Sequence, residues 1–216
     1  DVVQIRFHAA ALRLAEILYR RLIERGLAPV ARMAPSADME HSFFGLADQR
    51  QLGFVAPGEK ALSRGLHGSI FLNAPESLTH LRAAPPANIA AAAVASQPLR
   101  TLLEGREARG DYGWTLGIVP TAALARHAAL TPDQYARQVV RACFLDAAAP
   151  VSEWRRIHRR AGRIKRWLDG LPVACFHVES ATTDRVVPLG ARRRWAGVSG
   201  RNIPSFELFV SPAWRG

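Results

Sequence analysis

The 216-residue chain has few cysteines and lysines, and no long apolar run. Its two cysteines, Cys143 and Cys175, have neither metal-knuckle spacing nor the number for a disulfide framework, so we expect both to be small buried residues in a reducing cytoplasm. No apolar stretch approaches the roughly 20 residues that cross a bilayer. The sequence therefore predicts a soluble cytoplasmic protein with no membrane partner.

Motifs of the common enzyme classes are also absent. Phe7-His8-Ala9-Ala10 stands where a dinucleotide-binding loop would follow the first strand, and no phosphate-binding loop occurs. The chain has no His-Glu-x-x-His helix and no Gly-x-Ser-x-Gly turn. His8 follows a strand end, and His177 shares one strand face with Glu179; we interpret both histidines as structural. We therefore predict no residues that bind an organic cofactor.

Positive charge is abundant, and nearly all of it comes from arginine. The formal net charge is +11 and the isoelectric point is about 11.2. Arginines concentrate between Trp154 and Trp167 and at Arg192-Arg193-Arg194. A solvated helix face explains this pattern best, and nucleic acid is not the expected partner. The alternative is a module that binds nucleic acid or an acidic partner.

Strands and helices alternate along most of the chain. Helices are expected at residues 10–25, 89–104 (kinked or divided at Pro98), 131–145 and 152–168, with two short ones in 38–65 and another beginning at Pro75. Strands are expected at residues 2–7, 29–33, 67–73 and 112–119, and shorter ones at 172–179, 186–189, 192–196 and 207–210. This order predicts a three-layer α/β/α domain with a largely parallel sheet at residues 1–170, followed by a β-rich segment at 171–216.

Glu207 is the most informative acidic residue. It lies between a proline-bearing turn and the short β-prone stretch Leu208-Phe209-Val210. A carboxylate at the mouth of a strand can ligate a metal ion, and it can equally cap a turn. The sequence on either side of Glu207 is the evidence that distinguishes a metal ligand from a turn cap.

Several sequence blocks in the C-terminal third resemble the aminopeptidase S/aminopeptidase T family of metallopeptidases, the thermophilic metalloproteases. The blocks are Tyr135-Ala-Arg-Gln-Val-Val-Arg-Ala-Cys-Phe-Leu-Asp146, Pro150-Val-Ser-Glu-Trp154, Thr183-Asp184, Arg193-Arg194-Trp195, Gly200-Arg-Asn-Ile-Pro204 and Glu207-Leu-Phe-Val-Ser-Pro212. The resemblance is specific from about residue 135 onward. Before that point it extends only to the outline of a first α/β domain.

The resemblance implies a metal-dependent aminopeptidase that acts on peptides, forms a homodimer and uses two divalent ions (zinc, cobalt or manganese). Glu207 would be a ligand of one ion. In the family the other ligands, a second glutamate, two histidines and an aspartate, lie further along the chain, together with a tyrosine of the site. We therefore expect an N-terminal domain fragment that leads into an absent catalytic domain. It would contain no catalytic residue, bind no metal and be inactive by itself.

Two positions beside Glu207 depart from the family pattern. Phe206 stands where members usually have glycine, and Val210 stands where they usually have threonine. Phe206 favours a further alternative, a degenerate family member that keeps the fold without the activity.

Overall fold

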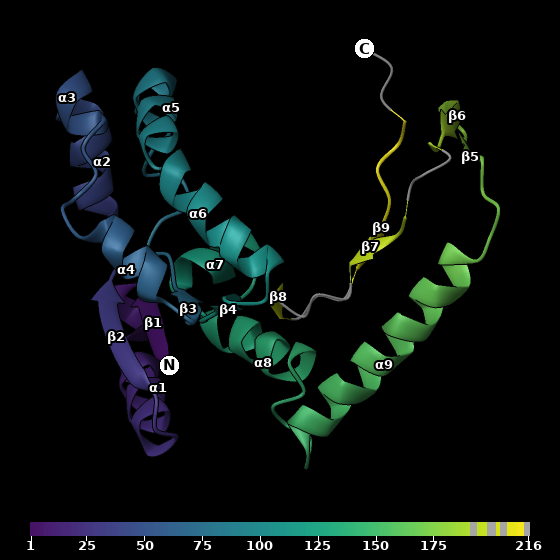
Figure 1. The fold of residues 1–216 in the computed structure, drawn as a ribbon, viewed down its shortest axis with the longest axis horizontal. Coiled ribbons are helices and arrows are strands. Elements are labelled where there is room, and N and C mark those ends of the chain that lie inside the picture. The colour runs from purple at the N-terminus through teal and green to yellow at the C-terminus, as the bar shows by residue number, and fades with distance from the viewer. Residues whose placement is uncertain (191–193, 198–201, 204–206, 214–216) are drawn as a thin grey trace. The chain divides into compact units, whose positions relative to one another are not determined.

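The computed structural model describes residues 1–190, 194–197, 202–203 and 207–213. The chain forms two compact units, unit 1 (residues 1–140) and unit 2 (residues 141–216). Figure 1 shows the elements of both units in chain order. The predicted domain boundary near residue 170 stays a prediction.

The centre of unit 1 is a parallel sheet of four strands in the order β2-β1-β3-β4. The strands are β1 (Val2–Phe7), β2 (Ala28–Met33), β3 (Gly68–Asn73) and β4 (Gly113–Ile118). All four predicted strands of this sheet are confirmed, because their apolar runs are typical of strands covered on both faces.

Helices flank this sheet, which confirms the predicted α/β class. The helices that begin in unit 1 are α1 (Leu12–Glu24), α2 (Ala37–Leu46), α3 (Gln49–Leu52), α4 (Glu59–Gly65), α5 (Pro86–Ala95), α6 (Gln97–Ala108), α7 (Ala122–His127) and α8 (Pro132–Ala142). In the sheet, β2 lies on one side of β1, and β3 and β4 follow on the other side, so the chain reverses its direction across the sheet after β2. Right-handed crossovers therefore place α1 on one face, and α4 and α6 on the other.

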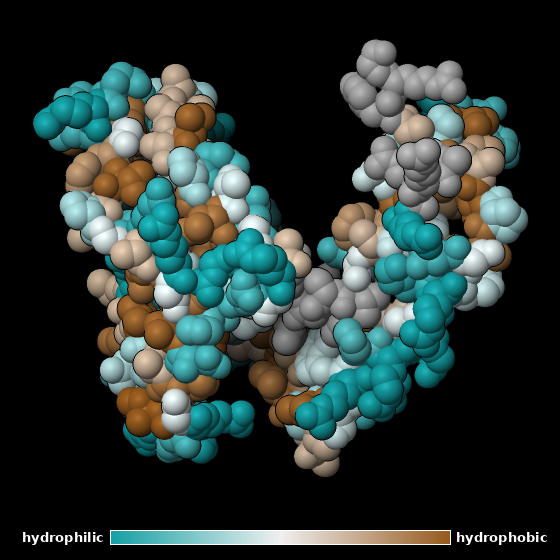
Figure 2. All heavy atoms as spheres, viewed as in Figure 1, coloured by the Kyte–Doolittle hydropathy of each residue, from teal (hydrophilic) through white to brown (hydrophobic). Residues whose placement is uncertain are grey.

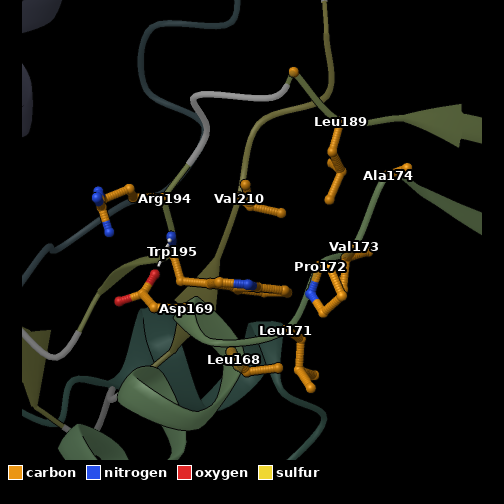
Figure 3. Close-up of a pocket in the computed structure, with 11 residues that line it drawn as sticks. Leu168, Asp169, Leu171, Pro172, Val173, Ala174, Leu189, Arg194, Trp195 and Val210 are labelled. Atoms are coloured by element: carbon orange, nitrogen blue, oxygen red, sulfur yellow. Dashed lines mark hydrogen bonds between the residues drawn. The ribbon is translucent and has the colours of Figure 1, made fainter.

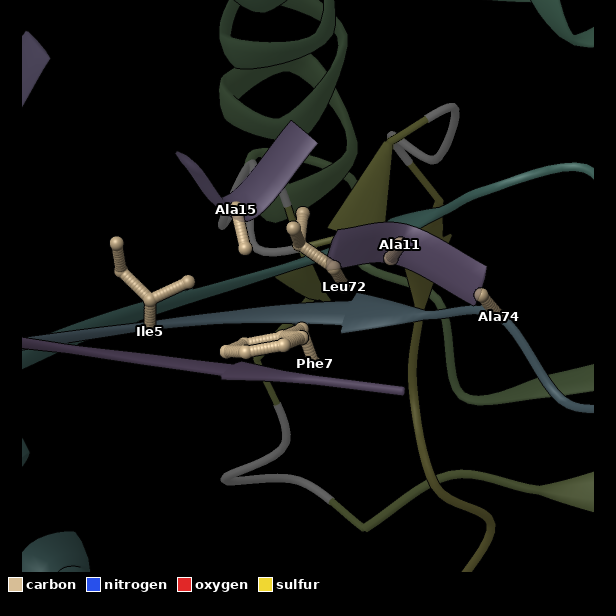
Figure 4. Close-up of a cluster of buried hydrophobic side chains, with 6 residues drawn as sticks. All are labelled: Ile5, Phe7, Ala11, Ala15, Leu72 and Ala74. Atoms are coloured by element: carbon tan, nitrogen blue, oxygen red, sulfur yellow. The ribbon is translucent and has the colours of Figure 1, made fainter. Parts of the chain in front are cut away.

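The core of unit 1 lies between the sheet and α1. Six buried side chains form it (Figure 4): Ile5, Phe7, Ala11, Ala15, Leu72 and Ala74. The alanines let the short helix Ala9–Ala11 and α1 approach the sheet closely. On the other face of β1, Gln4 is buried as well. A central strand that is covered on both sides explains why the sequence there is almost continuously apolar.

Some predicted helices of unit 1 differ from the structure. The predicted helix beginning at Pro75 is wrong, and α5 begins at Pro86, where a proline suits the first turn. Residues 38–65 contain parts of three helices instead of two. The division near Pro98 is confirmed, since α5 ends at Ala95 and α6 begins at Gln97.

The described part of unit 2 contains one long helix and several short strands. Helix α9 spans Pro150–Asp169, and the strands are β5 (Cys175–Ser180), β6 (Thr183–Pro188), β7 (Ala196–Gly197), β8 (Asn202–Ile203) and β9 (Leu208–Phe209). β5 and β6 form an antiparallel hairpin, and β7 pairs with β9. Short strands after α9 agree with the predicted β-rich segment, although Arg192 and Arg193 of the predicted strand 192–196 lie outside the described residues.

Candidate functional site

Glu207 directly precedes β9, at the end of the strand pair β7–β9. In this antiparallel pair Ala196 lies opposite Phe209, and Gly197 lies opposite Leu208. Glu207 is exposed and Leu208 is half-buried, as the alternation of a strand requires. The structure thus presents the carboxylate of Glu207 on the accessible side of its segment.

The backbone of Gly197 lies directly against the peptide of Glu207. Gly197 has φ +114°, a conformation that favours glycine. A Cβ atom added there would overlap the carbonyl oxygen of Glu207, and it would lie 3.0 Å from the carbonyl carbon. Glycine therefore allows the two strands to approach at the position of Glu207.

Polar and aromatic contacts connect the segment before β7 to the end of α9. The backbone N–H of Trp195 donates to Oδ1 of Asp169 over 3.0 Å, and Nζ of Lys165 lies 2.6 Å from Oδ2. The hydrogen bond from Lys165, followed by that from Trp195, lowers the pKa of Asp169. The Trp195 ring meets Phe176 of β5 edge-on, with 6.0 Å between ring centroids.

A pocket of about 460 Å³ opens beside Trp195. Figure 3 shows the Trp195 side chain extending between Leu168 and Val210, with Leu189 and Pro172 on further walls. Val210 and Leu208 alternate with Glu207 along the segment, so Val210 and Glu207 belong to opposite faces. The pocket is therefore on the side of the segment that faces away from the Glu207 carboxylate.

The histidines singled out in the sequence have protein partners. The N–H of Ala74 donates to Nδ1 of His8 over 3.0 Å, which joins the ends of β1 and β3. Nε2 of His177 lies 2.6 Å from Oδ1 of Asp184 across the β5–β6 hairpin. These partners agree with the structural interpretation of both histidines, although the partner of His177 is Asp184 and not Glu179.

A small cleft at the carboxyl ends of β1, β2 and β3 contains a third histidine. Its volume is about 90 Å³, and His8, Glu40 and His80 are among its lining residues. Nε2 of His80 lies 2.7 Å from the Glu40 carboxylate. The cleft lies where doubly wound folds have their ligand crevice, at the carboxyl ends of the strands. Glu40 and Nε2 of His80 are paired with each other there, whereas Nδ1 of His80 is buried without a hydrogen-bond partner in the described part of the chain.

The cysteines differ from each other. Cys143 is half-buried, and this burial raises the pKa of its thiol, which disfavours a nucleophile. Cys175 is exposed, so the prediction that both cysteines are buried is wrong. The reason is local: Cys175 begins the two-stranded β5–β6 hairpin, whose side chains are mostly exposed.

The arginines of α9 form a hydrophilic surface (Figure 2). The exposed members are Arg155, Arg156, Arg159, Arg160, Arg163 and Arg166. Within the helix Arg156 pairs with Glu153 at 2.7 Å. The exposure agrees with a solvated helix face, and the second arginine cluster lies mostly outside the described residues.

Comparison with known proteins gives a family. The profile of the thermophilic metalloprotease (M29) family matches residues 1–216. The chain belongs to the thermophilic metalloprotease (M29) family. The resemblance stated from the sequence blocks is thereby confirmed. No curated protein matches the chain.

A solved structure has a fold similar to that of this chain. The chain is similar to wild-type AmpT from Thermus thermophilus, with a TM-score of 0.74 and 19% sequence identity. The match covers 98% of this chain and 56% of the AmpT chain. The chain thus spans little more than half the length of that neighbour. In the part that the structure describes, no helix is long and apolar enough to span a membrane.

Membership of a metalloprotease family implies the use of a divalent metal. The Glu207 carboxylate has the right donor chemistry for such an ion. Among residues 1–190, 194–197, 202–203 and 207–213, however, no three His, Cys, Asp or Glu side chains form a group that could hold a metal. The described residues therefore do not form a complete metal centre, and the ligand role of Glu207 stays a prediction.

Proposed function

We propose that this chain supplies the N-terminal part of a metal-dependent aminopeptidase, which removes N-terminal residues from peptides. The observation that carries the proposal is the match of the metalloprotease family over residues 1–216. The enzyme would use two divalent ions (zinc, cobalt or manganese) and act as a homodimer in the cytoplasm. We call this chain, extended through the remaining ligands of the family, the parent protein.

Glu207 is the ligand that this chain contributes. Its exposed position before β9 leaves the carboxylate accessible to groups from elsewhere in the parent protein. Divalent metals, when bound in such a site, activate a water molecule and polarise the scissile carbonyl. The role of this chain is to hold one carboxylate in place, and unit 1 adds the α/β scaffold that precedes it.

The 216-residue chain by itself is expected to be inactive, because a single carboxylate cannot hold a pair of metal ions. Metal analysis after dialysis against zinc, cobalt or manganese should find no stoichiometric tight binding. Assays with aminoacyl anilides should find no hydrolysis. Stoichiometric metal together with hydrolysis would contradict this part of the proposal.

The ligand role is tested in the parent protein with Glu207→Gln. Glu179→Gln is the matched control, because Glu179 is also an exposed carboxylate of unit 2. Removing a metal ligand should lower metal occupancy and reduce kcat/KM by about 100-fold or more, whereas the control should stay near wild type. Wild-type occupancy and activity in E207Q would overturn the role of Glu207.

A degenerate family member, which Phe206 favours, is the alternative. Phe206 lies outside the described residues, and Val210 faces the pocket beside Trp195. In that case the parent protein would contain neither tight metal nor activity. The wild-type measurements in the same experiment decide this.

A second candidate function is suggested by the exposed arginines of α9. Such a surface would bind nucleic acid or an acidic protein mainly through charge, and its affinity would fall steeply as salt rises. A shift assay with labelled RNA at low and at physiological salt tests this. No binding at low salt removes the candidate.

A further inference from the structure

We propose that the exposed edge of β2, together with an apolar hollow beside it, binds an extended peptide as an added antiparallel strand. The peptide pairs with the backbone of Ala31 and Met33, places one large apolar side chain in the hollow and presents a carboxylate to Arg20. All of these groups belong to unit 1. This binding is independent of whether Glu207 ligates a metal.

β2 is an edge strand of the parallel sheet (Figure 1). In the part of the chain that the structure describes, it pairs only with β1. The N–H groups of Ala28 and Ala34 donate to carbonyl oxygens of the neighbouring segment, residues 1–7. Because successive residues of a parallel strand direct their backbone groups to opposite sides, the N–H and C=O groups of Ala31 and Met33 point away from β1. These two residues therefore offer donors and acceptors to a further strand.

A proline limits what can pair with this edge. Pro29 occupies the preceding outward position and has no N–H to donate. If a second copy paired antiparallel about Ala31, each Pro29 would stand against the Met33 carbonyl of the other copy, and both carbonyls would lack a donor. A short peptide opposite Ala31 and Met33 leaves no such group. The edge thus favours a short extended peptide over a second β2.

An apolar hollow of about 400 Å³ lies beside this edge, on the α1 face of the sheet. Its most buried lining residues are Phe7 and Ala15. Tyr19 and Ile23 of α1 line it as well, and they are 40% and 53% exposed. Pockets that bind small ligands typically measure about 300–1,000 Å³. The hollow therefore has room for a large apolar side chain, which would cover the exposed parts of Tyr19 and Ile23.

The register of the sheet connects the edge to the hollow. Ala31 pairs with Ile5, which belongs to the core under α1, so the side chain of Ala31 is on the α1 face and lines the hollow. A residue of an added strand opposite Ala31 directs its side chain to the same face. One peptide residue can thus exchange backbone hydrogen bonds with Ala31 and fill the hollow. Backbone pairing and a side-chain pocket are the two elements of recognition by strand addition.

The charges around the hollow favour an acidic peptide. On the exposed side of α1, Arg13 pairs with Glu16 at 3.4 Å and Arg21 pairs with Glu24 at 3.0 Å. Arg20 lines the hollow and is exposed, and it forms no ion pair with a carboxylate among the described residues. A peptide carboxylate two residues from the apolar side chain lies on the same face and complements Arg20. The net charge of +11 also attracts such a peptide.

The first test titrates the 216-residue chain into a labelled peptide and measures fluorescence anisotropy. The probe is Thr-Glu-Thr-Leu-Thr-Glu-Thr, with fluorescein at its N-terminus and an amidated C-terminus. Its leucine is meant for the hollow, and a glutamate stands two residues to either side. Saturable binding is expected, and serine in place of the leucine should weaken it about tenfold or more. No saturable binding of the probe would overturn the proposal.

Methylation of single peptide nitrogens tests the strand pairing. In the antiparallel arrangement the leucine N–H donates to the Ala31 carbonyl, whereas the N–H of the next threonine points away from β2. N-methylation of the leucine should abolish binding, and N-methylation of that threonine should change the affinity by less than about threefold. Equal losses from the two methylated peptides would contradict binding by strand addition.

Matched variants of α1 test the hollow. Ile23 lines it and is 53% exposed, whereas Ile17 is 44% exposed and is not among its lining residues. Ile23→Ser should weaken binding of the probe about tenfold, and Ile17→Ser should leave it unchanged. Both side chains are already partly exposed, so both variants should fold, which circular dichroism checks. Equal effects of the two substitutions would overturn the assignment of the hollow.

The role of Arg20 is tested with two probes. Arg20→Gln should weaken the glutamate probe several-fold and leave a probe with glutamine at both places unaffected. Equal losses for the two probes would contradict the contact with Arg20.

Sedimentation velocity tests the other possible occupant, a second copy of this chain. Ile23→Ser should leave the sedimentation coefficient of the chain unchanged. A dimer that I23S dissociates, together with no binding of the probe, would assign this face to self-association and overturn the proposal.

Discussion

Unit 1 and unit 2 hold their strands in place by different means. In unit 1, β1 lies between two parallel neighbours, and its side chains Ile5 and Phe7 are buried under α1. In unit 2, β5 pairs only with β6 and β7 only with β9, and Ala161 is the single buried apolar residue of that unit among those described. Packing orders the first unit, whereas backbone pairing and a few polar contacts order the second.

The difference matters because Glu207 belongs to the less packed unit. Its surroundings depend on the contact between Gly197 and its own peptide, and on the hydrogen bond between Trp195 and Asp169. Few buried side chains are available to restore the geometry when one of these contacts is lost. Changes in unit 1 should therefore act on global stability, and changes in unit 2 on local geometry.

The largest expected effect compares the same substitution in the two units. Ile5→Ala empties a fully buried site (0% exposed) and should lower the free energy of unfolding by about 2–5 kcal/mol. Ile164→Ala removes a side chain that is 39% exposed on α9 and should cost less than about 1 kcal/mol. Urea unfolding followed by circular dichroism measures both. Equal losses of unfolding free energy in the two variants would contradict the difference in packing between the units.

A smaller effect is expected at the start of α8 in unit 1. Thr131 accepts from the N–H of Gln134 over 3.3 Å, while its own N–H donates to the Gln134 side chain over 2.9 Å. Thr131→Ala should cost about 1 kcal/mol, whereas Thr131→Ser keeps the hydroxyl and should cost less. α9 has no such side-chain cap at Ala149. Identical melting temperatures for the two Thr131 variants would contradict the capping role.

A modest effect is expected at the ion pair that joins β2 to α4. Arg32 and Glu59 lie 2.7 Å apart, and the hydrogen bond from Arg32 lowers the pKa of Glu59 below 4.5. The pair stabilises the fold at neutral pH, and this stability is lost as pH falls through the lowered pKa. Glu59→Gln should cost about 0.5–1 kcal/mol at pH 7 and much less at pH 3.

The control for this pair is Glu24→Gln, which breaks the exposed Arg21–Glu24 pair within α1. It should change stability by less than about 0.5 kcal/mol at either pH. Unfolding curves for both variants at the two pH values measure the difference. If E59Q has the same cost at both pH values, the assigned pH dependence is wrong.

The smallest effect is local and concerns Asp169 in unit 2. Its pKa is lowered below 3.8, so the carboxylate is charged at neutral pH and is protonated only under strongly acidic conditions. Hydrogen exchange at the Trp195 amide should stay slow until the pH falls through that lowered pKa. Asp169→Asn keeps an acceptor oxygen, so its exchange should lack this acid transition. A transition at the same pH in D169N would rule out Asp169 as its cause.

Much of unit 1 was predictable from local sequence. The apolar runs around Ile5 and Ile70 predicted the strands β1 and β3, and the pair Thr131 and Gln134 predicted the start of α8. These signals are local, because a strand covered on both faces and a capped helix both require particular residues at short spacing. Local signals failed at Pro75, where a proline suited to a helix start is followed by a loop.

The candidate site was predictable only in part. The sequence blocks around Glu207 indicated the family, and the family match confirms it. The role of Glu207 as a ligand stays a prediction. Gly197 gave no signal in the sequence, because its importance depends on the register between two strands ten residues apart.

The amino-acid sequence by itself determined the alternation of elements, the family and the position of the single candidate ligand. Each of these depends on residue types at short spacing or on a motif. The tertiary structure alone decided that Gly197 lies against the Glu207 peptide, that Cys175 is exposed, and that Glu207 and Val210 face opposite sides. These facts depend on strand register and on which faces are covered, and both follow from contacts between residues distant along the chain.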